Sequence, residues 1–309
     1  MKLGMVGLGK MGANMVVRLL QDGHEVVATD LSQEAIDNVI DDGAEGAKDL
    51  GDLISKLSSP KVVWLMLPAG KVTESVFSDA LEALAEGDIV VDGANSNWKD
   101  SVRRAESAQE NGVHFVDAGV SGGVWGLKEG FNLMIGGSDE AFEHVEPAMK
   151  TLAPESGYAH LGPAGSGHFV KMIHNGIEYA LMQSYGEGFE AMANFPHHDL
   201  DLERIAELWK HGSVIRSWLL DLAANALSKD ARLEKIDDYV NDSGMGRWTV
   251  DFGVENAVPL PAITAALYTR FASRQDSSFS AKLSAALRNE FGGHAIKAVE
   301  EVEPEEREV

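Results

Sequence analysis

Six short apolar runs recur along the first 165 or so residues, and helix-length amphipathic stretches separate them. In chain order the runs are KLGMVG, EVVATD, VVWLML, DIVVDG, HFVDAG and NLMIGG. Strands that alternate with helices form βαβ units, because a crossover helix lets successive strands lie parallel in one sheet. The pattern therefore predicts an α/β fold, with a doubly wound, Rossmann-type, mainly parallel sheet over residues 1–165.

A glycine motif at the end of the first predicted strand indicates a dinucleotide site. GLGKMG follows KLGMV and opens a helix-length stretch, with Gly7, Gly9 and Gly12 in G-x-G-x-x-G spacing. The first glycine makes a tight turn, the second lets the backbone approach a pyrophosphate, and the third lets helix and strand pack closely. A doubly wound domain without a nucleotide is the alternative, and the strand-and-helix context of the motif argues against it.

The residue that ends the second predicted strand, Asp30, indicates which dinucleotide is bound. It lies 18 residues after Gly12, close to the spacing of about 20 typical of the acidic residue that binds the ribose 2′-hydroxyl. A carboxylate there would repel the 2′-phosphate of NADP, and DLSQEA offers that phosphate no arginine. We therefore expect NAD rather than NADP.

The remainder of the chain reads as helical. From residue 166 to about 300 the apolar spacing is that of helices, interrupted at NFPHHD and NDSGMGRW, so residues 166–300 are predicted to form an all-α domain for substrate binding and dimerisation. The last residues, 301–309, are too acidic to pack and are predicted to form an acidic tail.

Composition excludes several classes of protein. The 49 acidic and 26 basic residues give a formal net charge of −23, with no basic patch for nucleic acid. Because counterions screen such a surface, its acidity is typical of a halophilic protein in a high-salt cytoplasm. There is no cysteine for a thiolate metal site or a thiol nucleophile, and no apolar run suits a signal peptide or membrane span. We therefore expect a cytoplasmic protein without nucleic-acid or membrane partners.

One stretch of the helical region, GHFVKMIHNGIEY, aligns polar side chains of different chemistry. At the spacing of one helix face lie Lys171, His174, Asn175, Glu178 and Tyr179, here called the polar stripe. Four apolar residues, here called the apolar row, are expected on the opposite side: Val170, Ile173, Ile177 and Leu181. A solvated face is the common interpretation of a polar stripe. The mixed chemistry argues against it, because the other predicted surfaces are rich in Asp and Glu.

These motifs together resemble the decarboxylating 6-phosphogluconate dehydrogenases of the β-hydroxyacid dehydrogenase family. The resemblance spans nearly the whole chain and rests on GLGKMG, MLPAG, DGANS, DAGVSGG, GSGHFVKMIHNGIEY, SGMGRWT and FGGH, in the family's order. The chain is similar to a short form, since it lacks most of the duplicated helical half of the long form. It also has Arg247 where the family usually has lysine, which keeps the charge and changes the geometry.

The resemblance implies a reaction: C3 of 6-phosphogluconate is oxidised with NAD, C1 leaves as CO2, and ribulose 5-phosphate forms, as in the pentose phosphate pathway. It assigns Lys171 as base and then acid at the C3 oxygen, a role that needs a lowered pKa. It assigns Glu178 as the acid that protonates the enediol at C1. No metal is implied, because the ammonium stabilises the developing enolate. A purely structural role is the alternative for each residue.

The resemblance also implies binding residues, several of them at the carboxyl edge of the sheet, where doubly wound folds hold ligands. Cofactor contacts are implied for Gly7, Leu8, Gly9, Lys10, Met11, Gly12, Asp30, Leu67, Pro68, Ala69 and Asn95. Substrate contacts are implied for Asn95, Ser121, Gly122, Gly123, His174, Asn175, Tyr179, Arg247, Thr249, Arg270, Arg288 and His294. For His174, a purely structural role is the alternative to substrate binding.

The final pair of that set, Arg288 and His294 of LRNEFGGH, matches family residues that enter the neighbouring subunit's site at the phosphate end of the substrate. The resemblance therefore implies a homodimer or a dimer of dimers, with active sites completed by the partner's C-terminal segment. Without it, both residues would be interpreted as surface residues of a terminal helix.

Two other functions are compatible with parts of the sequence. A dehydrogenase of a non-phosphorylated β-hydroxy acid, such as 3-hydroxyisobutyrate, would have the same fold, and Arg270 and His174 argue against it. A non-catalytic NAD-binding sensor or scaffold would need neither Lys171 nor Glu178.

Overall fold

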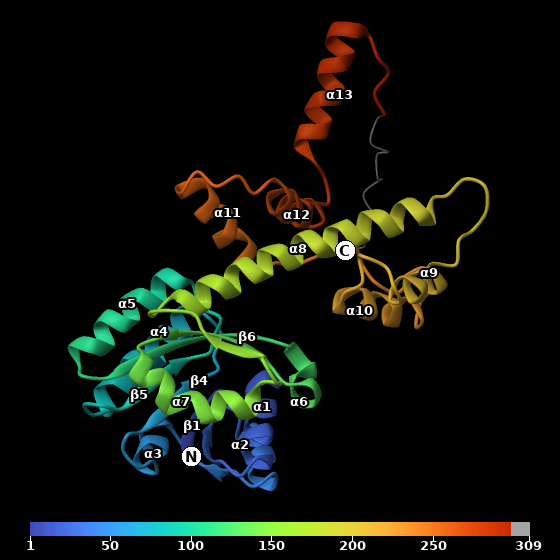
Figure 1. Ribbon diagram of the computed structural model, residues 1–309. Coiled ribbons are helices and arrows are strands. Elements are labelled where there is room, and N and C mark those ends of the chain that lie inside the picture. Colours follow the sequence, from blue (N-terminus) through green and yellow to red (C-terminus); the bar gives the residue numbers. More distant parts are fainter. Residues whose placement is uncertain (298–309) are drawn as a thin grey trace, which may run out of the picture.

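The structure, a computed structural model, describes residues 1–297 and consists of a sheet body and a helical region (Figure 1). The body is one sheet with helices on both faces, and the helical region extends away from the sheet. The predicted fold class, a Rossmann-type sheet followed by an all-α region, is confirmed. The predicted acidic tail, 301–309, lies outside the described residues.

The sheet has eight strands in the order β3-β2-β1-β4-β5-β6-β7-β8. Their bounds are β1 (Lys2–Val6), β2 (Glu25–Thr29), β3 (Glu45–Gly46), β4 (Val62–Leu65), β5 (Ile89–Asp92), β6 (His114–Ser121), β7 (Asn132–Gly137) and β8 (Tyr158–His160). Among the strand pairs of residues 1–297, only β6–β7 is antiparallel. All six predicted runs form strands. The strands β3 and β8 were not predicted, because two or three residues are too few to show an alternation of apolar and polar side chains.

The order of the strands determines where a ligand can lie. The chain builds β1, β2 and β3 outward on one side and then crosses back to place β4 beside β1 on the other. A crevice opens at such a switch point, outside the carboxyl ends of the strands. The glycine loop follows β1 at this point, so the fold puts GLGKMG beside the end of β4.

Helices cover both faces of the sheet and bury two apolar clusters. One face packs against α1 (Lys10–Gln21), α2 (Gln33–Asp41) and α7 (Asp139–Leu152). The other packs against α3 (Leu50–Ser55), α4 (Lys71–Ala83) and α5 (Trp98–Glu110). Between β6 and β7 the chain forms the short helices η1 (Gly123–Trp125) and α6 (Gly126–Glu129). The sheet, packed on both faces, therefore gives rigid support to the residues at its carboxyl edge.

A 28-residue helix, α8 (Ser166–Ala193), joins this body to the remaining helices (Figure 1). Their bounds are α9 (Leu202–Trp209), α10 (Trp218–Leu227), α11 (Met245–Glu255), α12 (Pro261–Ala272) and α13 (Phe279–Gly292). NFPHHD lies in a loop as predicted, whereas the second interruption begins earlier than predicted, directly after α10, and ends where α11 starts. In Figure 1, α13 projects away from the body.

Candidate active site

The glycine loop has the geometry that a pyrophosphate requires. Gly7 has φ +97°, and a Cβ there would lie 2.3 Å from the carbonyl oxygen of Met66. A Cβ on Gly12 would lie 2.1 Å from the carbonyl oxygen of Gly7, so only glycine lets α1 approach β1. A Cβ on Gly9 would meet nothing within 4 Å, which leaves the backbone open to a ligand. These three positions fit a bound dinucleotide.

A cavity of about 810 Å³, here called the cofactor cavity, lies over this loop. Predicted cofactor residues that line it are Gly7, Gly9, Lys10, Met11, Gly12, Asp30, Leu67, Pro68 and Asn95. The other two, Leu8 and Ala69, do not line it; the backbone N–H of Leu8 donates to Asp30 Oδ2 at 2.6 Å. The N–H of Ser32 donates to Oδ1 of the same carboxylate at 2.8 Å, so Asp30 is held in place at the end of β2.

Sequence reasoning missed the part of this cavity's lining that lies outside the motifs and the six predicted strands. The residues in this part are Leu31, Lys48, Asp49, Leu50, Val72, Val76 and Asp79. They come from the segments that follow β2 and β3 and from one side of α4. No motif marks them, and β3 itself was not predicted. The spacing of Val72, Val76 and Asp79 along α4 was the one signal available, since it places all three on the same side of a helix.

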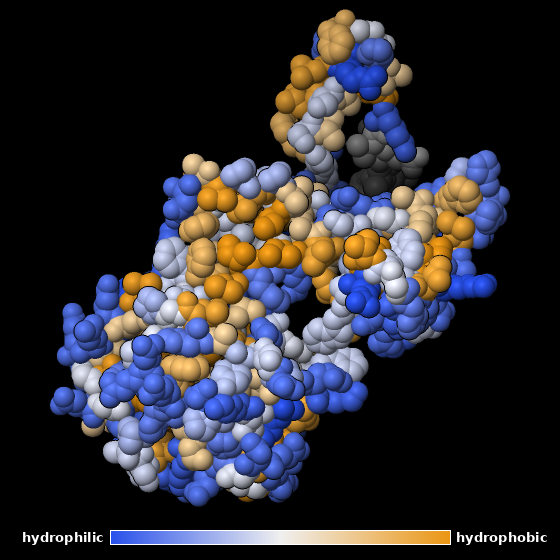
Figure 2. Space-filling view, in the orientation of Figure 1, coloured by the Kyte–Doolittle hydropathy of each residue, from blue (hydrophilic) through white to orange (hydrophobic). Residues whose placement is uncertain are grey.

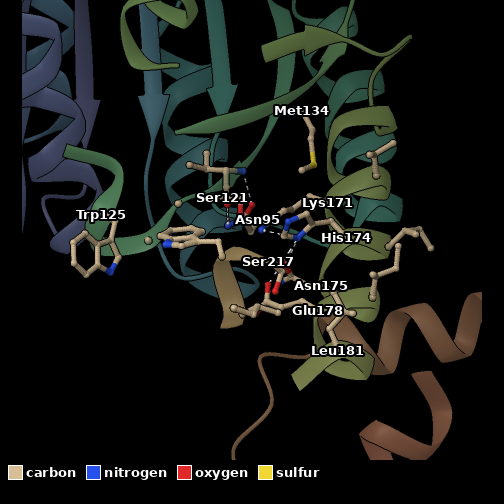
Figure 3. Close-up of a pocket in the computed structure, with 18 of the residues that line it drawn as sticks. Asn95, Ser121, Trp125, Met134, Lys171, His174, Asn175, Glu178, Leu181 and Ser217 are labelled. Atoms are coloured by element: carbon tan, nitrogen blue, oxygen red, sulfur yellow. Dashed lines mark hydrogen bonds and ion pairs between the residues drawn. The ribbon is translucent and has the colours of Figure 1, made fainter. Parts of the chain in front are cut away.

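A second cavity of about 840 Å³, here called the catalytic pocket, lies between the end of β6, α8 and α10. Predicted residues that line it are Asn95, Ser121, Gly122, Gly123, Lys171, His174, Asn175 and Glu178. Figure 3 shows Lys171, His174 and Glu178 extending from α8 on the side of Asn95 and Ser121. Met11 and Asn95 line both cavities, so the cofactor cavity adjoins the pocket that the polar stripe lines.

Lys171 is nearly enclosed, with 4% of its surface exposed. α8 lies so close to β6 that a Cβ on Gly119 would be 2.5 Å from the Cβ of Lys171. Burial lowers the pKa of the Lys171 amine to about 8, and the nearby charge of Glu178 raises it in part. The predicted role required a lysine with a lowered pKa, and this one has it.

The neighbours of Lys171 on the stripe lie within 4 Å of one another through their polar atoms. The Nδ1 atom of His174 lies 3.5 Å from Lys171 Nζ and 3.0 Å from Asn175 Oδ1. The same atom lies 3.9 Å from Glu178 Oε2. Four of the five stripe residues therefore form one connected polar group that faces the catalytic pocket.

Side-chain hydrogen bonds to the backbone fix both the start of α8 and the turn that carries Asn95. Asp117 of β6 accepts the N–H groups of Gly165 and His168, at 2.6 and 2.7 Å, and burial raises its pKa. Asn95 has φ +53°, and its side chain exchanges two hydrogen bonds with the backbone of Val120, at 2.8 and 3.1 Å. Asn95 thus holds the end of β6 as well as lining both cavities.

The remaining predicted substrate residues lie away from the lining of the catalytic pocket. Tyr179 and Thr249 are buried between α8, α11 and α12, and the Thr249 hydroxyl lies within hydrogen-bond distance of the carbonyl oxygens of Met172 and Met245. Arg247 and Arg270 lie on α11 and α12. Arg288 and His294 are exposed, on α13 and just beyond it. The single chain therefore assembles the stripe but not the whole predicted substrate site.

One expectation about α8 is wrong. The apolar row was expected opposite the polar stripe, yet Val170, Ile177 and Leu181 are exposed, while Lys171 and Tyr179 are buried. At 100° per residue the two sets occupy adjacent sectors of the helix. The sheet body covers Lys171, and α11 and α12 cover Tyr179. Val170, Ile177 and Leu181 are left exposed along the wall of the catalytic pocket, and Figure 2 shows hydrophobic residues along α8.

Comparison with known proteins agrees with the geometry over both regions of the chain. Residues 2–162 match the model of the NAD-binding domain of 6-phosphogluconate dehydrogenase, and residues 167–304 match that of its C-terminal domain. The chain belongs to the 6-phosphogluconate dehydrogenase family. The resemblance expected from the motifs is thereby confirmed.

Individual relatives show how the chain compares with other members of the 6-phosphogluconate dehydrogenase family. The NAD(+)-dependent, decarboxylating enzyme of Haloferax volcanii is 46% identical over 298 residues, which cover 96% of this chain and 98% of the relative. The solved 6-phosphogluconate dehydrogenase of Plasmodium falciparum superposes with a TM-score of 0.82 at 28% identity, over 99% of this chain and 67% of that one. The chain thus resembles the short members in length.

A Mycobacterium tuberculosis 3-hydroxyisobutyrate dehydrogenase shares the fold, with a TM-score of 0.71 at 22% identity over 93% of this chain and 99% of that one. Among residues 1–297, no helix is long and apolar enough to cross a membrane. In the same residues no three His, Cys, Asp or Glu side chains cluster as metal ligands would.

Proposed function

We propose that this chain catalyses the oxidative decarboxylation of 6-phosphogluconate to ribulose 5-phosphate and CO2, with NAD as the oxidant. One observation carries the proposal. A buried lysine whose pKa is about 8 lies on the wall of a pocket that shares Met11 and Asn95 with the cofactor cavity. An amine with that pKa can both accept and return a proton near neutral pH.

In the proposed reaction, Lys171 acts at the C3 oxygen. When bound, NAD supplies the acceptor for the hydride that leaves C3. Neutral Lys171 takes the proton of the C3 hydroxyl, so a 3-keto acid forms beside an ammonium group. As the C1–C2 bond breaks and CO2 leaves, its electron pair enters an enolate, and the ammonium stabilises the charge and returns the proton to the C3 oxygen.

Glu178 is proposed to act at the other end of the reacting carbons. It lies seven residues after Lys171, about 10 Å along the helix axis. A protonated Glu178 can donate to the carbon that lost the carboxylate, which becomes C1 of the product. His174 and Asn175 are proposed to orient substrate hydroxyls, because both line the pocket between the acid and the base.

Other residues are proposed to hold the two ends of the substrate. Ser121, Gly122 and Gly123 offer a hydroxyl and backbone N–H groups at the end of β6 for the carboxylate. Tyr179, Arg247 and Arg270 are proposed for the phosphate. Thr249 is proposed to support that end indirectly, since backbone carbonyls occupy its hydroxyl.

We further propose a homodimer, or a dimer of dimers, in which α13 packs on a second copy of the chain. On one face of α13, at four-residue spacing, lie Phe279, Leu283, Leu287 and Phe291. Phe279 and Phe291 are 78% and 77% exposed, and α13 has no buried residue. A helix of this kind is stable only if its apolar face is covered. Val170, Ile177 and Leu181 are exposed on α8 along the wall of the catalytic pocket and offer a matching apolar face. Arg288 and His294 would then complete the partner's site.

The proposal includes a division of the chain into two domains. Residues 1–165 are proposed as the NAD-binding domain and residues 166–300 as the substrate and dimerisation domain, with the boundary just before α8. A phosphorylated sugar acid and NAD are both intracellular metabolites, which supports a cytoplasmic location.

The decisive experiment measures NADH and CO2 from 6-phosphogluconate at low and at molar salt. We expect equal amounts of the two products, and a faster reaction with NAD than with NADP. Oxidation of 3-hydroxyisobutyrate without any reaction of 6-phosphogluconate would refute the proposal in favour of the non-phosphorylated substrate class. NAD binding without oxidation of either acid would favour a sensor or scaffold.

A further inference from the structure

Beside Tyr179, the last residue of the polar stripe, two arginines bind a single buried carboxylate, Asp242, whose side chain is 4% exposed. Arg247 donates from Nε at 2.7 Å and from Nη2 at 3.1 Å, and Arg274 Nη1 lies 2.9 Å from the same carboxylate. A third arginine, Arg270, donates to the carbonyl oxygen of Asn241 at 2.7 Å. These four side chains, Arg247, Arg270, Arg274 and Asp242, are here called the arginine cluster.

Aromatic rings hold the guanidinium groups of the cluster from another side. The Arg247 and Arg274 guanidinium carbons lie 4.4 and 5.2 Å from the ring centre of Phe271. The Arg270 guanidinium lies 3.7 Å from the ring centre of Tyr179, the last residue of the polar stripe. A guanidinium that is both stacked and hydrogen-bonded has few orientations left, so little entropy is lost when it binds an anion.

The segment that carries Asp242 is itself tied to the helices around it. The N–H of Val240 donates to Ser273 Oγ, and the N–H of Ser243 donates to the Tyr179 hydroxyl, both at 3.0 Å. The N–H of Gly244, the residue before α11, lies 3.3 Å from Asp242 Oδ2. Asp242 is therefore a fixed point between α8, α11 and α12.

The charge of the cluster suits a phosphate monoester. The three guanidinium groups and Asp242 leave the cluster itself with a net charge of +2, while the carboxylate of Asp251 acts on Arg247 from outside it. A phosphate monoester carries close to two negative charges at neutral pH. Hydrogen bonding from Arg247 lowers the pKa of Asp242 to about 2, so its charge is constant across the working range. Arg247 and Arg274 are 50% and 20% exposed, so N–H donors not used by Asp242 can reach a ligand.

An ordinary structural ion pair explains the cluster less well. One cation would satisfy Asp242, and a buried ion pair is weak evidence of stability. Yet three of the 26 basic residues gather here, in a chain with 49 acidic ones. The pairing also gives a reason for arginine at position 247, because a lysine could not donate to both oxygens of Asp242 from two fixed N–H groups.

We propose that Asp242 is a positioning residue that holds Arg247 and Arg274 for the 6-phosphate, and that Arg274 is a further phosphate-binding residue. The inference rests on the proposed function. It adds a residue outside the motifs that predicted the phosphate site, and it makes the acidic Asp242 necessary for the binding of an anion.

The test compares steady-state kinetics of Arg274→Gln, Arg274→Lys and Asp242→Asn with the wild type. We expect Arg274→Gln to raise the KM for 6-phosphogluconate about tenfold or more, with kcat and the KM for NAD nearly unchanged, and Arg274→Lys to recover part of the loss. Asp242→Asn should raise the same KM, although it removes a negative charge. Asp199→Asn is the matched control, since Asp199 pairs with Arg232 at 2.6 Å on the exposed α8–α9 segment.

The sign of the Asp242→Asn effect decides between positioning and competition. A lower KM would mean that the carboxylate competes with phosphate, and it would overturn the proposal. An unchanged KM for 6-phosphogluconate in Arg274→Gln would also overturn the proposal, provided that the wild type turns over this substrate and that the two proteins have the same melting temperature.

A binding measurement separates this inference from the proposed function. If the wild type does not oxidise 6-phosphogluconate, the proposed function fails, and inorganic phosphate still probes the cluster. We expect phosphate to raise the melting temperature of the wild type and of Asp199→Asn, and to raise that of Arg274→Gln less. Equal stabilisation of all three would overturn the assignment of Arg274.

Discussion

The α/β region of the chain, residues 1–160, buries most of its large apolar side chains, whereas the helical region, residues 166–292, leaves many at the surface. Apolar clusters cover both faces of the sheet in the α/β region, and Leu3, Trp64 and Phe131 have no exposed surface. In the helical region the buried clusters are small, and α13 buries nothing. A region of a protein is stabilised only by the apolar surface that its folding removes from water. We therefore expect the α/β region to fold on its own contacts and the helical region to need another chain.

The largest effect should come from the residue at which the two regions meet, Lys171. Lys171→Met keeps much of the side-chain volume and removes the proton acceptor, so kcat should fall by about 10³-fold or more. The KM for 6-phosphogluconate and for NAD should change little, which steady-state kinetics can measure. Lys210→Met is the control, because Lys210, just after α9, pairs with Glu207 and is outside the lining of both cavities. An intact kcat with a raised KM would make Lys171 a binding residue.

Breaking the proposed contact between chains should affect the helical region alone. Leu287→Asp puts a charge on the apolar face of α13, so we expect monomers in analytical ultracentrifugation, a large loss of activity, and unchanged NAD binding. Ala285→Asp is the matched control, since Ala285 is exposed on the opposite face of the same helix. Dimers that persist in Leu287→Asp would show that α13 is not in the interface.

Mixing two inactive variants tests whether the sites are shared between chains. Each proposed site takes Lys171 from one chain and Arg288 from the other. In a random mixture of Arg288→Ala and Lys171→Met, half of the dimers would contain one chain of each variant. Each such dimer would carry one native site. Activity should return to roughly one quarter of the wild-type value after subunit exchange. No recovery, with exchange verified by mass spectrometry, would place both residues in the same chain's site or remove Arg288 from it.

A smaller effect is expected within the α/β region. Asp30→Asn keeps the shape of the side chain and loses the charge that excludes a 2′-phosphate. The KM for NAD should rise about tenfold, and the preference for NAD over NADP should weaken. Asp79→Asn, at the same cavity, is the control for charge alone. An unchanged ratio of the two kcat/KM values would assign cofactor selection to another residue.

The smallest effect is a shift in a pH profile. Neutral Lys171 is the form that accepts a proton, so kcat/KM should rise with pH through about 8. Because the charge of Glu178 raises that pKa, Glu178→Gln should move the rise to lower pH. The same variant should slow the overall reaction more than hydride transfer, which single-turnover absorbance can resolve. A rise at higher pH in Glu178→Gln would contradict the assigned interaction.

The two regions also differed in how far the sequence predicted them. In the α/β region, alternation and glycine spacing identified six strands and the cofactor loop, since both are local patterns. β3 and β8 carry no pattern, and the part of the cofactor cavity lined by Lys48 and Val76 forms only when distant segments meet.

In the helical region, the pattern predicted helices but not what covers them. The exposure of Val170 and the burial of Lys171 depend on how closely α8 approaches Gly119, a contact between residues far apart in sequence. Asp242 belongs to no motif, because its role comes only from the three helices around it. The chemistry of the stripe was predictable, and the direction in which it faces was not.

The close approach of α8 to β6 at Gly119 fixes the phase of the whole helix. Each residue added to a helix turns everything after it by about 100° and advances it by 1.5 Å. One residue inserted between Gly167 and Lys171 would therefore swing the amine out of the catalytic pocket, although no side chain of the stripe would be lost. One residue inserted after Leu181 would leave the stripe in register and misalign the rest of α8 with α9, α10 and α12. The first turns of α8 thus set the orientation of the polar stripe and of every residue that follows it on the helix.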